Sequence, residues 1–193
     1  LFNLIKSDLS ALGVAHGVFV SEKALIDSGA IEIVLEQLKA RELVYTGTLE
    51  PPKGRVLEDW EERPQLLFAA TKFNDEIDRP LKKSDGSSTY FASDIAYHKD
   101  KFNRGYEMIV DVFGADHMDA YPDVMSAIDN LGCDSKKMKV LIHQFVTIMK
   151  DGKPVKMSTR KANFITLDEL IDEVGADVVR YFFIMRGMNS HLN

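Results

Sequence analysis

Residues 108–148 alternate between strand-like and helix-like sequence, and this order restricts the possible folds most strongly. Residues 108–113 are short, rich in β-forming side chains and followed by Gly114. Residues 118–131 suit a helix that ends at Gly132, and residues 139–148 contain enough apolar side chains for one or two buried strands. A strand, a helix and a strand in this order predict a right-handed parallel crossover, so we expect an α/β fold.

The sequence before this region predicts a helix and several short elements. Four apolar residues follow the helical spacing i, i+3, i+4 and i+7, namely Ile31, Val34, Leu35 and Leu38. Gly29 separates this helix from an expected turn at residues 22–26. Residues 43–45 suit a short strand, and residues 50–64 suit a loop or insertion because prolines and a glycine interrupt them. Residues 66–70 are compatible with either a helix or a strand.

The sequence after this region predicts two further helices. Thr166 and Glu169 form the Thr-x-x-Glu pattern of a capping box, which marks the start of a helix. Gly175 separates that helix from a second one at residues 177–186. Between the two ends of the chain, residues 84–88 carry a turn signal and residues 90–102 suit a helix.

Composition excludes several classes of protein. The chain has 193 residues and a net charge of −6, so it has no overall attraction for nucleic acid. Its single cysteine, Cys133, excludes an internal disulfide and fits a reducing compartment, and we therefore expect a cytoplasmic protein. No apolar run approaches the roughly 18–20 residues that span a bilayer, so we expect no membrane insertion.

Residues 150–161 are strongly basic within this acidic chain. They contain five basic residues and one acidic residue, and Gly152 and Pro154 favour a loop. Such a loop at the carboxyl end of a strand lies where open α/β sheets bind ligands. Its lysines and a serine hydroxyl suit a polyphosphate. The alternative, which charge alone favours, is a solvated basic surface loop.

Three blocks of sequence resemble one enzyme family. The run from Lys156 to Arg160, Lys-Met-Ser-Thr-Arg, resembles the Lys-Met-Ser-Lys-Ser signature of class I aminoacyl-tRNA synthetases, and residues 163–184 look like the arginyl-tRNA synthetase version of the region after that signature. Residues 83–98 are similar to that family's Ser-Asp-Gly…Thr-Tyr…Asp-Ile block. Residues 112–117 are similar to its Gly-Ala-Asp-His block. The blocks lie in the family's order and cover most of residues 80–186.

The resemblance implies a fold and an activity. Residues 1–82 would be a helical connective segment, and residues 83–193 the second half of a Rossmann-type parallel-sheet catalytic domain. The parent enzyme would activate arginine with ATP, accompanied by Mg²⁺, and transfer it to its tRNA as a monomer. The family's His-Ile-Gly-His signature does not occur in these residues, and its anticodon-binding domain would follow Asn193. We therefore expect a fragment of a longer polypeptide, inactive alone.

The same resemblance assigns residues to ATP. The expected ATP-binding residues are Lys156, Met157, Ser158, Arg160 and His117. Lys156 would be catalytic because its loop would stabilise the charge that develops on pyrophosphate. Thr159 departs from the signature, which has a second lysine there, and Arg160 or Lys161 would then supply that charge.

A further group of residues is expected to bind arginine. Tyr90 and Asp94 are spaced i, i+4, so a helix would place them on one face. By resemblance they hold the substrate, and a carboxylate suits a guanidinium because it accepts paired N–H donors. Glu22 would present a second carboxylate. The alternative is a buried tyrosine and an aspartate that lies at the surface or at the start of a helix.

Other interpretations remain open at this point. Asp116, His117 and Asp119, or His98 with Asp100, could be metal ligands, but their spacing is not that of known sites and we expect no metal. The chain could also be a non-catalytic synthetase-like binding module, or part of a class I synthetase for another amino acid.

Overall fold

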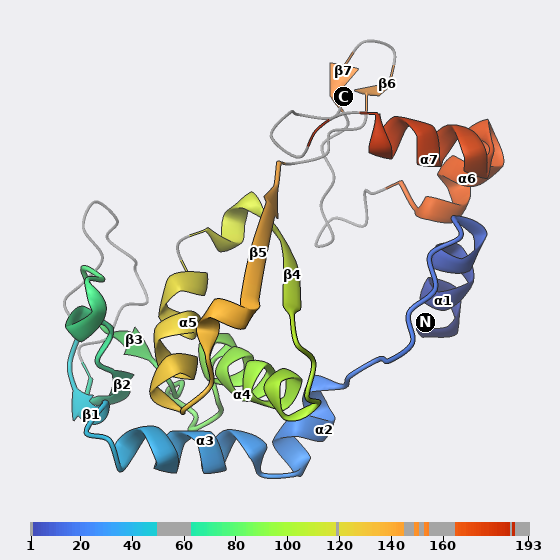
Figure 1. Ribbon diagram of the computed structural model, residues 1–193. Coiled ribbons are helices and arrows are strands. Elements are labelled where there is room, and N and C mark those ends of the chain that lie inside the picture. Colours follow the sequence, from blue (N-terminus) through green and yellow to red (C-terminus); the bar gives the residue numbers. More distant parts are fainter. Residues whose placement is uncertain are drawn as a thin grey trace. The chain divides into compact units, whose positions relative to one another are not determined.

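The computed structural model describes residues 2–49, 63–118, 120–144, 149–150, 153–154, 165–185 and 187. They group into two compact units (Figure 1). The larger unit comprises Val20–Asp111 and His117–Leu141, and the smaller one comprises Leu1–Phe19, Val112–Asp116 and Ile142–Asn193. Among the described residues, no helix is both long enough and apolar enough to cross a lipid bilayer.

The larger unit combines helices with short strands. Its helices are α2 (Glu22–Asp27), α3 (Ala30–Lys39), α4 (Tyr90–Asn103) and α5 (Tyr121–Asn130). Its antiparallel sheet has the order β1 (Val44–Gly47), β2 (Gln65–Phe68), β3 (Arg79–Pro80). Its short 3-10 turns are η1 (Ala70–Phe73) and η3 (Ser135–Lys137), whereas η2 (Ala115–His117) contains residues of both units.

Strands β4 (Ile109–Gly114) and β5 (Met138–His143) form a parallel pair, with α5 between them in the chain. This confirms the predicted strand–helix–strand order, the parallel pairing and the α/β class.

The core of the larger unit lies among α3, α4, α5 and the β1–β3 sheet. The predicted apolar face of α3 is confirmed, because all four of its residues are buried. Phe68 on β2 is fully buried, and its ring lies 5.9 Å from that of Phe73 and 5.7 Å from that of Phe91. Ile95 and Ala96 bring α4 into the same cluster. The core therefore anchors α4 from several sides.

The start of α4 is held by the preceding turn. The predicted turn at residues 84–88 is present, with Gly86 at a φ of 82° and Asp85 accepting hydrogen bonds from the amide and hydroxyl of Ser87. Thr89 then caps the helix, because its hydroxyl oxygen accepts from the amide of Ala92 at 3.3 Å. The same hydroxyl donates to the carbonyl of Pro80 at 2.8 Å. Thr89 thus ties the first turn of α4 to β3.

We predict that replacing Thr89 with alanine lowers the free energy of unfolding by about 1 kcal/mol, the usual cost of losing an N-cap side chain. Denaturation with urea measures this change. The matched variant Thr89→Ser keeps the hydroxyl and should retain most of the stability. An equal loss in both variants would mean that the methyl group, rather than the cap, stabilises this turn.

The smaller unit is mainly helical. Its elements are α1 (Phe2–Ala11), β6 (Met149–Lys150), β7 (Lys153–Pro154), α6 (Leu167–Val174) and α7 (Ala176–Ile184). The predicted capping box is present, with Thr166 and Glu169 each accepting a hydrogen bond from the other's main-chain amide. The guanidinium of Arg180 on α7 donates to the carbonyl of Leu12 just after α1.

Three expectations about secondary structure need correction. Residues 22–26 form a helix rather than a turn, because Ser21 caps α2. The helix predicted from residue 118 begins at Tyr121, with Pro122 in its first turn, where proline is favoured. Strand β5 is partly exposed rather than buried. The remainder of that predicted strand, residues 145–148, and most of the predicted insertion, residues 50–62, lie outside the described residues.

Candidate functional site: an acidic pocket on α2 and α4

A small pocket lies in the larger unit where α2 meets α4. Its volume is about 210 Å³. Seven residues line it: Val20, Glu22, Leu25, Tyr90, Ser93, Asp94 and Tyr97. It is smaller than the pockets of drug-sized ligands, which are about 300–1,000 Å³. Its size suits the side chain of a small ligand.

The pocket contains all three residues that were predicted to bind arginine. Tyr90 and Asp94 are one turn apart on α4, so the expectation that the helix places them together is confirmed. Glu22 is the first residue of α2, whose start is capped by the Ser21 hydroxyl accepting from the amide of Ala24. Tyr90 is 76% exposed, so the alternative of a buried tyrosine is wrong, whereas Asp94 is exposed, as that alternative expected.

The pocket carries two carboxylates, and none of the described residues that line it is basic. Burial raises the pKa of the Asp94 carboxyl, and the charge of Glu22 raises it further. The charges of His98, His117 and Lys101 act in the opposite direction and lower this pKa. A cation that enters the pocket would relieve the repulsion between Asp94 and Glu22 and would favour the ionised form of both carboxyls. The electrostatics therefore favour a positively charged ligand.

The remaining lining residues shape the pocket. Val20 and Leu25 supply an apolar wall, and Ser93 is buried on α4. Tyr97 adds a second aromatic ring, three residues after Asp94 and therefore on the same side of the helix. This helical spacing could have identified Tyr97 from the sequence. Aromatic rings beside carboxylates are suited to hold a planar cation between them.

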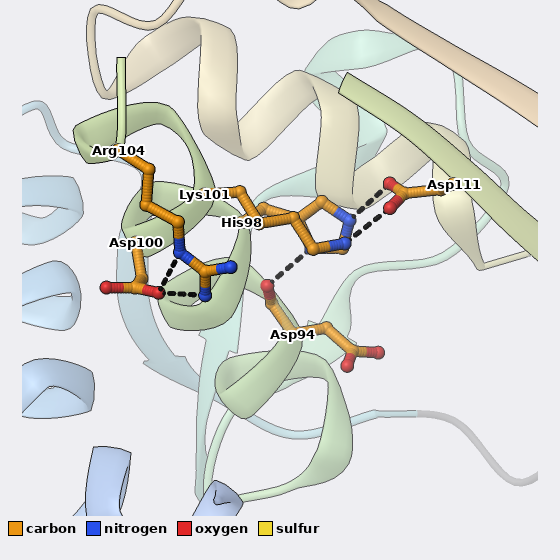
Figure 2. Close-up of polar contacts among 6 residues, drawn as sticks. All are labelled: Asp94, His98, Asp100, Lys101, Arg104 and Asp111. Atoms are coloured by element: carbon orange, nitrogen blue, oxygen red, sulfur yellow. Dashed lines mark hydrogen bonds and ion pairs between the residues drawn. The ribbon is translucent and has the colours of Figure 1, made fainter. Parts of the chain in front are cut away.

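A buried polar network lies next to Asp94 (Figure 2). The ring Nδ1 of His98 is 2.7 Å from the main-chain oxygen of Asp94, and its Nε2 is 2.8 Å from a carboxylate oxygen of Asp111 on β4. The ammonium group of Lys101 bonds to the other oxygen of Asp111. Desolvation tends to raise the pKa of Asp111, but its bonds to His98 and Lys101 outweigh that effect and lower it.

This network corrects one interpretation of the sequence. His98 was considered as a metal ligand together with Asp100, but Asp100 pairs with Arg104 while His98 faces Asp111. No group of three or more potential metal ligands occurs among the residues that the structure describes.

The expected ATP residues are described only in part. His117 ends η2 and is close enough to influence the charge of Asp94, although it is not one of the seven lining residues. Lys156, Met157, Ser158 and Arg160 lie outside the described residues. Their assignment to ATP remains a prediction.

Solved structures with a similar fold place the chain in one structural class. The first is a Campylobacter jejuni protein assigned to the arginyl-tRNA synthetases, with a TM-score of 0.78 and 34% identity over 99% of this chain and 38% of that one. The second is methionyl-tRNA synthetase from Mycobacterium tuberculosis in complex with methionyl-adenylate, with a TM-score of 0.71. At 12% identity over 93% of this chain and 49% of the other, it shows only a shared fold. The fold is that of a class I synthetase catalytic domain.

Sequence comparison identifies the family within that class. The profile of the class I (R) tRNA synthetase catalytic domain matches residues 54–181, and the chain belongs to this family. Arginine–tRNA ligase from Rhodospirillum rubrum is 52% identical over 98% of this chain and 32% of its own length. The ligase from Parvibaculum lavamentivorans is 49% identical over 100% of this chain and 33% of its own length. The chain thus spans about a third of the length of these relatives.

Proposed function

We propose that the intact protein is an arginine–tRNA ligase, which activates arginine with ATP and transfers it to tRNA. Family membership and relatives that carry this name support the proposal. The observation that carries it is the pocket between α2 and α4, where two carboxylates and two tyrosines meet without a basic neighbour among the described lining residues. Among the amino acids, arginine best matches such a pocket.

Selection of arginine would depend on charge and shape together. The guanidinium group is planar, permanently charged and rich in N–H donors, so it can bond to Asp94 and Glu22 at once. Tyr90 and Tyr97 would flank its plane. A neutral side chain would leave both carboxylates without a cation, and this penalty would reject it more strongly than a difference in size would.

The chemistry would require parts of the chain beyond the pocket. We propose that the arginine carboxylate attacks the α-phosphate of ATP, and that Lys156, with Met157, Ser158, Arg160 and His117, binds the nucleotide. Lys156 would stabilise the negative charge on the departing pyrophosphate. Mg²⁺ would enter bound to the phosphates of ATP, because this ion typically takes substrate phosphates as ligands. We further propose that the enzyme is a cytoplasmic monomer.

The function is tested by charging of tRNA with labelled arginine by the intact protein. We expect arginine to be attached and citrulline, in which a neutral urea replaces the guanidinium at nearly the same shape, to react at least about 100-fold more weakly. Charging with lysine tests whether a positive charge alone is sufficient. Charging with methionine tests whether the protein is specific for an amino acid other than arginine. Absence of charging with every amino acid would favour a non-catalytic binding module, and equal use of citrulline would refute selection by charge.

A further inference from the structure

His98 lies directly behind the proposed arginine site. It follows Asp94 by one helical turn on α4, and only 5% of its surface is exposed. Figure 2 shows its ring between the main chain of Asp94 and the carboxylate of Asp111, while the carboxyl group of Asp94 points away from the ring. His98 cannot touch a ligand of Asp94 from this position, so any effect must act through its neighbour.

Both ring nitrogens of His98 face hydrogen-bond acceptors. A main-chain carbonyl can only accept, and it lies 2.7 Å from Nδ1. A carboxylate that is ionised can also only accept, and an oxygen of Asp111 lies 2.8 Å from Nε2. Lys101 bonds to the second oxygen of Asp111, which favours the ionised form of this carboxyl. Both hydrogen bonds can form only if each ring nitrogen carries a hydrogen, so the contacts require an imidazolium.

We infer that His98 is a positioning residue for the amino-acid substrate: an imidazolium held behind Asp94, whose positive charge favours the carboxylate form that a guanidinium requires. This inference rests on the proposed function. With the imidazolium that its two contacts require, the network of Asp111, His98 and Lys101 carries a net positive charge, because one carboxylate then faces two cations. That charge acts to lower the pKa of Asp94, against the rise caused by its partial desolvation and by Glu22, before any substrate arrives.

Other groups around Asp94 also affect its charge. Glu22 on α2 disfavours the carboxylate, and His117 after β4 favours it. Tyr90 and Tyr97 line the same pocket, and the Tyr97 ring also lies 6.2 Å from that of His98. A test of His98 must therefore compare two proteins that differ only at this residue, so that the contributions of the other groups cancel.

The test is the pH dependence of kcat/KM for arginine in the intact protein, with wild type compared to His98→Gln. Loss of the imidazolium should let Asp94 take up a proton at higher pH. The deficit of the variant should therefore grow as the pH is lowered from 8, by at least about threefold across the acid range in which Asp94 takes up its proton. The same comparison for KM of ATP should show no such dependence. A deficit that is the same at every pH would overturn the inference.

Ile95→Val is the matched control for lost stability. Ile95 is buried on the same helix and carries no charge, so its truncation weakens packing without changing the field at Asp94. We expect its pH profile to follow that of wild type, and an equal shift in this variant would count against His98. If wild type fails to charge tRNA with arginine, the proposed function has failed instead. NMR of His98 in isotope-labelled intact protein then still reports on the imidazolium: two ring N–H groups at neutral pH support it, and one excludes it.

Discussion

Replacing Asp94 with asparagine in the intact protein should lower kcat/KM for arginine by about 100-fold or more. Asp94 is exposed at the pocket, so the charge pair would be desolvated only when the bound guanidinium covers it. Loss of one partner of such a desolvated pair costs about 2–5 kcal/mol, and about 1.4 kcal/mol corresponds to a factor of ten. Asparagine keeps the size of the side chain but removes the charge. It also turns an N–H group toward the guanidinium donors. The measurement is steady-state charging of tRNA at varied arginine and varied ATP.

The control for this variant is Asp100→Asn on the same helix. Asp100 pairs with Arg104 and does not line the pocket. We expect it to leave kcat/KM for arginine nearly unchanged. KM for ATP should change little in either variant, because we propose that Asp94 binds the amino acid rather than ATP. A loss of less than about threefold in Asp94→Asn would show that the guanidinium binds elsewhere.

Part of the fold was predictable because local periodicity reflects burial. The four apolar residues of α3 at helical spacing, Ile31, Val34, Leu35 and Leu38, all enter the core. Helix α2 was missed because six residues are too few to show a period, and its only strong signal is the capping Ser21. The exposure of β5 was also not predictable, because an apolar strand does not reveal which elements cover it.

At the candidate site, residues that are close in the sequence could be paired in advance, whereas contacts between different elements could not. Tyr90 and Asp94 were paired from their helical spacing, and the structure brings them together. Glu22 comes from a different helix, so only the family resemblance connected it with them. The contact of His98 with Asp111 depends on how α4 packs against β4. Sequence spacing carries no information about that packing, and the network of His98, Asp111 and Lys101 was therefore found only in the structure.

The buried network also predicts a large change in stability. Replacing Asp111 with asparagine should lower the free energy of unfolding of the intact protein at pH 7 by about 3 kcal/mol, the low end of the cost of removing one partner of a buried ion pair. Asp111 is 5% exposed, and its loss leaves His98 and Lys101 without their acceptor. Urea denaturation measures this change.

The pH dependence of this loss distinguishes lost charge from lost packing. Because the pKa of Asp111 is lowered by folding, its contribution is complete above its ordinary value of about 3.9 and disappears as the pH falls through the folded value. The difference between wild type and Asp111→Asn should persist down to about pH 4 and narrow only in stronger acid. Asp27→Asn, which removes an exposed pair with Lys23 at 3.0 Å, should have little effect at any pH. A difference that stays constant in acid would mean that Asp111 contributes through its shape and that His98 does not need a charged partner.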